Sequence, residues 1–319
     1  VGAITVVNAS ALTVGSATVN SLTYTGLSAN NAAVNLSSSV TSGTALTLTN
    51  AVSTGTGALT LTGNSLSVAT NATGTGALTL QPYTAGTTIG INGGTGALAL
   101  TSVLLGKFTG SAWSGITLGN VSAGNIAVSG TNAFNLSSLN VATGGNITLN
   151  ASSSLTSSRA DGHIAVAAGG NFVNNSGATA IRQTGTNGTW MVYSTAPGSN
   201  TFGSLNSQNK AIWGQTASTL SPTSLISTYG NGGGSKGYFV FSQSGTVVAN
   251  SGNLSKTYGT DNSADLAGTL TYTGTAFAPL ANTYLANSVA DAIDTAPTVT
   301  SAGSAVRAAK GTYDISASG

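Results

Sequence analysis

The chain has 319 residues, of which only 4% are charged, and it contains one His, no Glu and no Cys. Soluble globular domains carry about 25% charged residues, so this composition excludes coiled coils and helical bundles, whose wet faces need Glu, Lys and Arg. The eight cations are scattered singly, which excludes a nucleic-acid-binding surface, and the lack of Cys excludes a disulfide scaffold. Solubility must come from Ser, Thr, Asn and Gly, which sheets tolerate better than helices do.

The N-terminal segment Val1–Thr5 has neither a Met nor a basic region, and it already follows a strand-like pattern. We therefore expect a fragment or a processed segment of a longer protein. The longest apolar stretch, Ala97–Gly106, has about half of the roughly 20 residues that a membrane helix requires. The sequence thus predicts no membrane span.

The first 106 residues carry no charged side chain, and one short phrase recurs among them. In this phrase Leu alternates with Thr or Ala, and its copies start at Ala45, Ala58, Ala77 and Ala97. A second phrase, with Gly followed by alternating Ile, Val or Leu, starts at Gly124, Gly145 and Gly162. Alternation at period two predicts strands, and an irregular repeat of about 20 residues predicts a solenoid.

We predict an all-β fold, a right-handed parallel β-helix over residues 1–186, with roughly eight coils in residues 20–180 spaced about 4.8 Å apart. A β-sandwich or an antiparallel barrel is the alternative for many short strands, but neither predicts one returning phrase. Outward-facing positions in this interpretation are Thr47, Thr60, Thr79 and Thr148. Inward-facing positions are Leu46, Leu59, Leu78, Leu98, Ile126, Val128, Ile147, Leu149, Ile164 and Val166.

The texture of the sequence changes twice towards the C-terminus. Residues 187–249 are rich in aromatic side chains, which suit terminal coils that close the solenoid. Residues 250–319 contain most of the Asp residues, and they predict a small antiparallel β module whose last strand is incomplete or is completed by another chain. Ala249–Asn253 is the predicted linker between the two parts.

Three features together resemble the filamentous haemagglutinin-like exoproteins of bacterial two-partner (type Vb) secretion. The first is the phrase Gly145–Asn150 within irregular repeats, and the second is Trp190–Ser194 followed by Tyr238–Ser242, similar to the segment that ends such solenoids. The third is Ser255–Thr260 with Leu270–Tyr272, which resembles the opening of the small MBG modules that follow in these proteins. The secretion domain that begins members of this family is not visible in the sequence.

This resemblance implies a secreted or surface-attached bacterial protein that serves as the structural stalk of an adhesin or extracellular filament and promotes attachment or biofilm formation. It also implies export through an outer-membrane secretion pore. The implied partners are a glycan or protein on a host or bacterial surface, further copies of the chain, and tandem modules of the same long chain. We expect no enzymatic activity, no cofactor, no metal and no nucleic-acid partner.

Few residues support chemistry of another kind. His163, preceded by Asp161, occupies the position that Asn holds in the other copies of the second phrase, so we interpret it as a turn residue and not as a metal ligand or general base. Asp261 and Asp265 supply two oxygen ligands where calcium needs six to eight. The threonine pairs Thr47–Thr49 and Thr60–Thr62 resemble an ice-binding ladder, but the later copies do not keep the pair.

Two further functions remain as alternatives to the stalk. A carbohydrate-binding module would need exposed aromatic rings as a sugar platform, and the candidates for glycan stacking are Trp113, Trp190 and Trp213. A polymerising subunit of an extracellular fibre would need complementary, uncapped ends.

Overall fold

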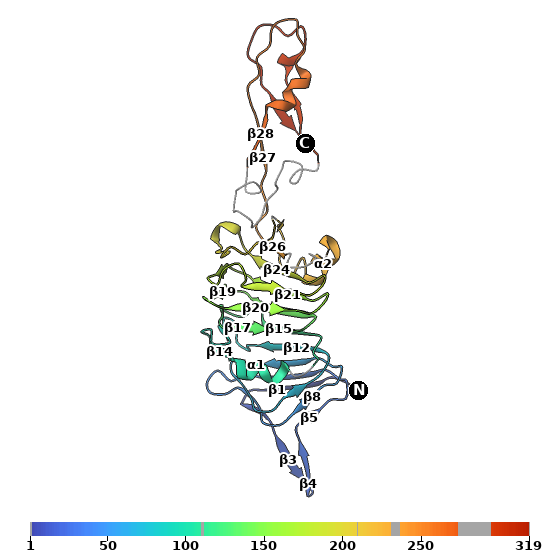
Figure 1. Ribbon diagram of the computed structural model, residues 1–319, viewed down its shortest axis with the longest axis vertical. Coiled ribbons are helices and arrows are strands. Elements are labelled where there is room, and N and C mark those ends of the chain that lie inside the picture. Colours follow the sequence, from blue (N-terminus) through green and yellow to red (C-terminus); the bar gives the residue numbers. More distant parts are fainter. Residues whose placement is uncertain (1, 110–111, 209, 231–236, 274–294, 319) are drawn as a thin grey trace.

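The computed structural model describes residues 2–109, 112–208, 210–230, 237–273 and 295–318. Strands make up 40% of the structure and helices 10%. Most of the chain winds into a rod whose coils are stacked in parallel, and two small antiparallel sheets lie beyond its C-terminal end (Figure 1). This architecture confirms the predicted all-β solenoid and excludes the sandwich and the antiparallel barrel.

One parallel sheet runs along the whole rod and gives it its length. Its neighbouring strands pair in register, so equivalent positions of successive coils lie side by side. In spatial order the ten strands are β1 (Ile4–Asn8), β6 (Val34–Ser38), β9 (Leu59–Thr62), β12 (Ala77–Gln81), β15 (Gly115–Asn120), β18 (Ser138–Thr143), β21 (His163–Ala168), β24 (Thr189–Ser194), β26 (Gly237–Phe241) and β25 (Ala211–Trp213).

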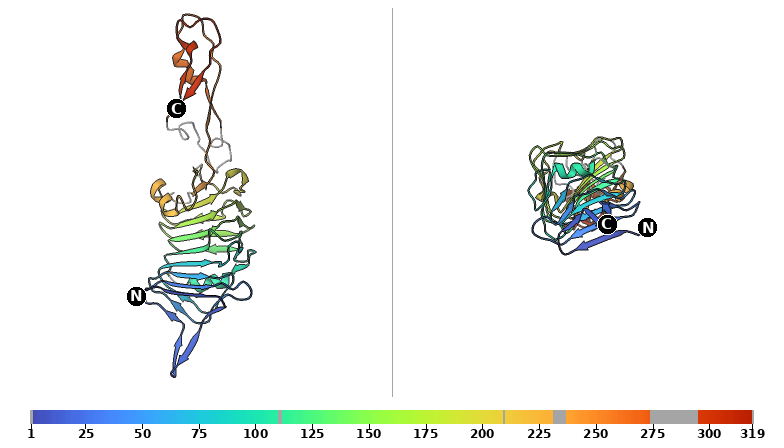
Figure 2. Two further views of the ribbon diagram at one scale, coloured as in Figure 1. Left: turned by 180° about the vertical axis from the view of Figure 1, so that it is seen from behind. Right: turned by 90° about the horizontal axis from the view of Figure 1, so that it is seen from below.

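Shorter parallel sheets form the other faces of the rod, and the view along its axis shows the coils enclosing one interior (Figure 2). The second face consists of β2 (Leu12–Val14), β7 (Leu46–Leu48) and β10 (Leu66–Val68), followed by β14 (Leu98–Leu100), β13 (Ile89–Ile91), β16 (Ile126–Val128), β19 (Ile147–Leu149) and β22 (Phe172–Asn174). The third face consists of β5 (Leu27–Ser28), β8 (Val52–Ser53) and β11 (Ala72–Thr73), followed by β17 (Thr131–Ala133), β20 (Ser154–Ser157) and β23 (Ile181–Gln183).

A short helix, α1 (Ser102–Thr109), interrupts the third face between β11 and β17. It buries Leu104, Leu105 and Phe108 and leaves Val103 in solvent. This apolar segment therefore closes the core in place of a strand. The sequence analysis did not predict the helix, because the segment shows no charged face and no capping residue that would announce one.

The core is a continuous column of aliphatic side chains. All ten residues predicted to face inward are at most 1% exposed. Thr47, Thr60, Thr79 and Thr148 are half-buried on the outer side of their strands. The alternation of Leu and Thr therefore determines which side chains enter the core, as predicted, because successive residues of a strand point to opposite faces.

The predicted period of about 20 residues is wrong as a measure of the coil. Leu59 and Leu78 are true stacking partners, 19 residues apart, but Leu46 lies on another sheet than Leu59, so the 13-residue step between them stays within one coil. True coils span between 19 residues and the 38 that separate Leu78 from its partner Ile116. Six strands of the long sheet, not roughly eight, lie in residues 20–180.

An antiparallel hairpin contradicts the expectation that residues 20–180 contain parallel coils only. It consists of β3 (Ser16–Val19) and β4 (Leu22–Thr25), and Asn20 and Ser21 form its turn with φ of 50° and 64°. Positive φ at both central residues is the mark of a type I′ hairpin turn. The hairpin projects from the N-terminal end of the rod (Figure 1).

A second, smaller core lies outside the long sheet near its C-terminal end. Helix α2 (Pro222–Tyr229) begins at Ser221, whose side chain accepts a hydrogen bond from the N–H of Ser224. The helix buries Leu225 against Met191, Tyr193 and other outward-facing side chains of β24 and β26. The 3-10 helix η1 (Pro197–Ser199) lies in the loop after β24.

The remaining residues form antiparallel pairs. Strand β27 (Val248–Ser251) pairs with β28 (Leu270–Thr273), and β29 (Thr298–Thr300) pairs with β30 (Ser316–Ser318). Two 3-10 helices accompany them, η2 (Ser263–Thr269) and η4 (Ala302–Ser304).

The expected linker Ala249–Asn253 is wrong in its first half, because β27 includes Ala249, Asn250 and Ser251 and pairs them with β28. The boundaries after residues 186 and 249 stay predictions, and part of the predicted module, residues 274–294, lies outside the described residues. Among the residues that the structure describes, no helix is long and apolar enough to cross a membrane.

Candidate functional surfaces of the rod

The outer face of the long sheet carries rows of uncharged polar side chains. In-register pairing places Asn35, Thr60, Thr79, Thr117 and Asn140 on five successive strands. These side chains are half-buried between their neighbours. Because none of them is charged, this part of the rod presents hydroxyl and amide groups at the regular spacing of the strands, about 4.8 Å.

Closer to the C-terminal end the same row becomes apolar. Asn140 is followed by Ala165, Met191 and Tyr238 on β21, β24 and β26. These three side chains are buried under α2 and the loop that precedes it. The hydroxyl of Tyr238 donates to the carbonyl of Tyr229 at 2.9 Å, and burial raises the pKa of Tyr238. The outer face is therefore wet along most of the rod and dry only where α2 covers it.

Asparagine side chains tie successive coils together at one corner. Asn125 Oδ1 accepts from the backbone N–H of Asn146 at 2.9 Å, and Asn146 Oδ1 accepts from the N–H of Asn171 at 2.8 Å. Each bond crosses from one coil to the next and satisfies a corner amide that strand pairing leaves free. These contacts explain why Asn recurs in the second phrase, and they assign it a structural role.

The C-terminal end of the rod is filled by aromatic rings. Phe239 contacts Trp190 with ring centroids 5.4 Å apart and Phe202 at 4.6 Å, both in edge-to-face geometry. Phe241 contacts Trp213 at 5.1 Å. Phe239 and Phe241 are fully buried, and Trp190 and Phe202 nearly so. Rings of this size fill the last coils, where aliphatic side chains have no further coil to pack against.

This burial contradicts two of the three proposed glycan-stacking residues. Trp113 is 2% exposed, and its Nε1 donates to the carbonyl of Phe108 at 3.0 Å inside the core next to α1. Trp190 is 2% exposed under Phe239. Neither ring offers a face to a sugar, because each fills space that the core would otherwise leave empty. Trp213 is half-buried on Phe241, and its proposed role stays a prediction.

His163 begins β21, at the edge of the small outer core. It stacks between Ser138 and Thr189 of the neighbouring coils, and burial lowers its pKa below the ordinary value of 6.5. Asp161 lies at a corner with φ of 56°, and its Oδ1 accepts from Asn187 Nδ2 at 3.0 Å. Within the described ranges, no group of three or more His, Cys, Asp or Glu residues could hold a metal ion.

Asp261 and Asp265 lie at the start of η2 and the turn before it. Hydrogen bonds from the side chain and backbone of Ser263 lower the pKa of Asp261, and the Ser263 N–H lies 2.8 Å from Oδ1. The carboxylate is thus used to cap a turn.

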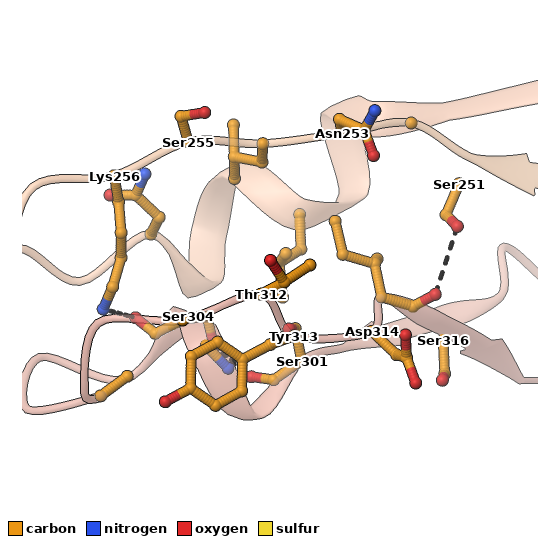
Figure 3. Close-up of a pocket in the computed structure, with 18 of the residues that line it drawn as sticks. Ser251, Asn253, Ser255, Lys256, Ser301, Ser304, Thr312, Tyr313, Asp314 and Ser316 are labelled. Atoms are coloured by element: carbon orange, nitrogen blue, oxygen red, sulfur yellow. Dashed lines mark hydrogen bonds between the residues drawn. The ribbon is translucent and has the colours of Figure 1, made fainter.

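A hollow of about 1260 Å³ opens between the segments Ser251–Lys256 and Ala308–Ser316 (Figure 3). Its walls are closed at one side by Ser251 Oγ, which donates to the carbonyl of Ile315 at 3.2 Å. At the other side Lys256 Nζ donates to the carbonyls of Thr260 and Ser304, each at 3.0 Å, and to that of Ala305. The ammonium group of Lys256 therefore joins segments of the chain and does not stand free in the hollow.

Comparison with known proteins does not extend these observations. No family model matches the chain, and the searches of curated proteins and of solved structures find no significant similarity.

Proposed function

We propose that this chain is the rod-like stalk of a bacterial surface adhesin or extracellular filament, and that it holds an adhesive element away from the cell. The observation that carries the proposal is the single ten-stranded parallel sheet along the rod. In-register backbone hydrogen bonds between all neighbouring strands make such a sheet stiff along its axis. A stalk needs this property, whereas an enzyme needs a converging set of reactive groups.

The surface chemistry supports the same proposal. The exposed rows of hydroxyl and amide groups keep the rod hydrated without net charge, so neighbouring rods do not repel one another electrostatically. The resemblance of Gly145–Asn150, Trp190–Ser194 and Ser255–Thr260 to two-partner secretion exoproteins supports an extracellular location and export through an outer-membrane pore. The adhesive partner would be a surface glycan or protein.

Removing one coil in register tests the stalk. Ser138 pairs with Gly115 on one side and with His163 on the other. Deletion of residues 138–162 therefore joins Ser137 to His163 and lets β15 pair directly with β21. Bacteria that display this shortened rod should attach to surfaces as well as those that display the full chain, because a stalk needs its stiffness and not any one coil.

A deletion that is shorter by one residue, 138–161, is the matched control. It shifts β21 by one position, turns the inward side chains outward and should abolish folding. The substitutions His163→Ala and Asp161→Asn should leave attachment unchanged. The proposal fails if the in-register deletion folds but loses attachment, if either substitution reduces it, or if displaying the full chain gives no attachment above that of bare cells.

A further inference from the structure

The N-terminal end of the rod presents three strand edges that have no partner among the described residues. The edge strands are β1, β2 and β5, one on each face. Their inner edges are bonded: the N–H groups of Ile4, Leu12 and Leu27 donate to carbonyls of the next coil at 2.8–2.9 Å. Since N–H and C=O groups alternate sides along a strand, those of Thr5 and Val7 point out of the end. Unpaired edges of this kind invite strand pairing.

The interior of the solenoid is also uncovered at this end. Ile4, Leu12, Val14 and Leu27 face inward but are only half-buried, and Val6 is 37% exposed. Their stacking partners one coil further in are 2% exposed or less: Val34, Leu36, Leu46, Leu48 and Val52. The first coil therefore lacks the apolar layer that covers every coil behind it.

The hairpin β3–β4 adds a second uncovered apolar surface at the same end. One of its faces carries hydroxyl pairs, Ser16 with Thr25 and Thr18 with Thr23. The opposite face carries Val19, Leu22 and Tyr24, which are 56%, 61% and 62% exposed. A two-stranded hairpin is only marginally stable in water, so an apolar face on a projecting hairpin needs a surface to pack on.

These features together define what can cover the end. Only another open solenoid end presents strand edges on the same three faces around an apolar interior. The opposite end of this chain cannot serve, because its last coils are closed by buried rings and the chain continues from it into β27 (Figure 1). The open end of a second copy can serve. Identical surfaces repel when they carry charge, but residues 1–106 contain no charged side chain.

We propose that two copies of this chain bind each other through their N-terminal ends, around a two-fold axis that is perpendicular to the long sheet. The axis places β1 antiparallel to β1 of the second copy and brings β2 over β5 on the other two faces, and each hairpin packs its apolar side on the other rod. Such an isologous contact closes after two copies. The product is a double-length rod with both C-terminal ends outward, not a growing fibre.

Sedimentation equilibrium and light scattering of the 319-residue chain test the proposal. We expect a dimer that dissociates only on dilution, and small-angle scattering should show about twice the length of one rod. Val7→Pro removes an N–H of the outer edge and leaves the inner ladder intact, and Leu22→Asp places a charge on the apolar face of the hairpin. Each should raise the dissociation constant by about tenfold or more.

Val121→Asp is the matched control, because this side chain is 76% exposed on a distant coil. It should leave the dimer unchanged, and circular dichroism should show that all three variants fold. The chain has no Cys, so one spin label at Ser10→Cys should report a short distance between copies, and one at Ser199→Cys should report none. A monomer at every soluble concentration, growth beyond two copies, or a dimer that survives both variants overturns the proposal.

Discussion

The two ends of the rod solve the same physical problem in different ways. A parallel solenoid has no natural stop, because each coil exposes strand edges and an apolar interior to the next. At the C-terminal end Phe239 is fully buried between Trp190 and Phe202. At the N-terminal end Val6, an inward-facing residue of the same sheet, remains 37% exposed.

The difference shows that closure depends on side-chain size and not on backbone geometry. The same ladder of parallel strands runs into both ends. Only the C-terminal coils carry rings large enough to fill the end by themselves, and α2 adds cover on the outer face. The N-terminal coil carries aliphatic residues, which need a further layer. Stability should therefore be concentrated at the closed end, and four predictions test this.

The largest effect should come from removing a ring at the closed end. Phe239→Ala should lower the free energy of unfolding by about 3–5 kcal/mol, because it leaves a cavity between Trp190 and Phe202. Val6→Ala, the matched change at the open end, should cost less than about 1 kcal/mol, since its side chain still meets water. Denaturant unfolding measures both values. Equal losses at the two ends would show that they are packed alike.

The next effect concerns a buried amide near the closed end. Asn174 is 1% exposed, and its Nδ2 donates to the carbonyls of Gly177 and Phe202, both at 2.9 Å. Asn174→Ala leaves these carbonyls without a partner and should cost about 1–3 kcal/mol. Asn35→Ala, near the open end, removes one 3.3 Å bond to Thr5 and should change stability by no more than about 0.5 kcal/mol. Thermal unfolding of both variants compares them; a larger loss for Asn35→Ala would reverse the comparison.

A glycine at the closed end should resist even a methyl group. A Cβ at Gly237 would lie 1.9 Å from Trp190 Cε2, whereas one at Gly198 would meet nothing within 4 Å. Gly237→Ala should therefore destabilise by about 1–3 kcal/mol through overpacking, and tryptophan fluorescence should report the displaced ring. Gly198→Ala is the control. If both substitutions are neutral, the last coils are looser than their geometry indicates.

The smallest effect should be a pH dependence near the closed end. Burial lowers the pKa of His163 in the folded chain below its ordinary value of 6.5. The unfolded chain then binds the proton more readily, so stability is complete above pH 6.5 and declines as the pH falls through that value towards the folded pKa. His163→Gln should remove this slope from a plot of unfolding free energy against pH. A slope that persists in the variant belongs to another group.

The sequence by itself determined the interior and exterior of the rod. Inward Leu, Ile and Val and outward Thr follow from alternation at period two, which is a local property of any extended strand. The lack of charge and the switch to aromatic residues after residue 186 are equally direct. For the same reason the sequence indicated a closed C-terminal end before any coordinates.

Only the tertiary structure decided which residues lie next to each other. Thr79 and Thr117 are neighbours on the long sheet although 38 residues separate them, because β13, β14 and α1 intervene. Leu46 and Leu59 share a phrase but lie on different faces. The burial of Trp113 depends in the same way on the gap that α1 fills. Spacing along a chain does not distinguish a step around one coil from a step to the next, because both place a Leu in the same core.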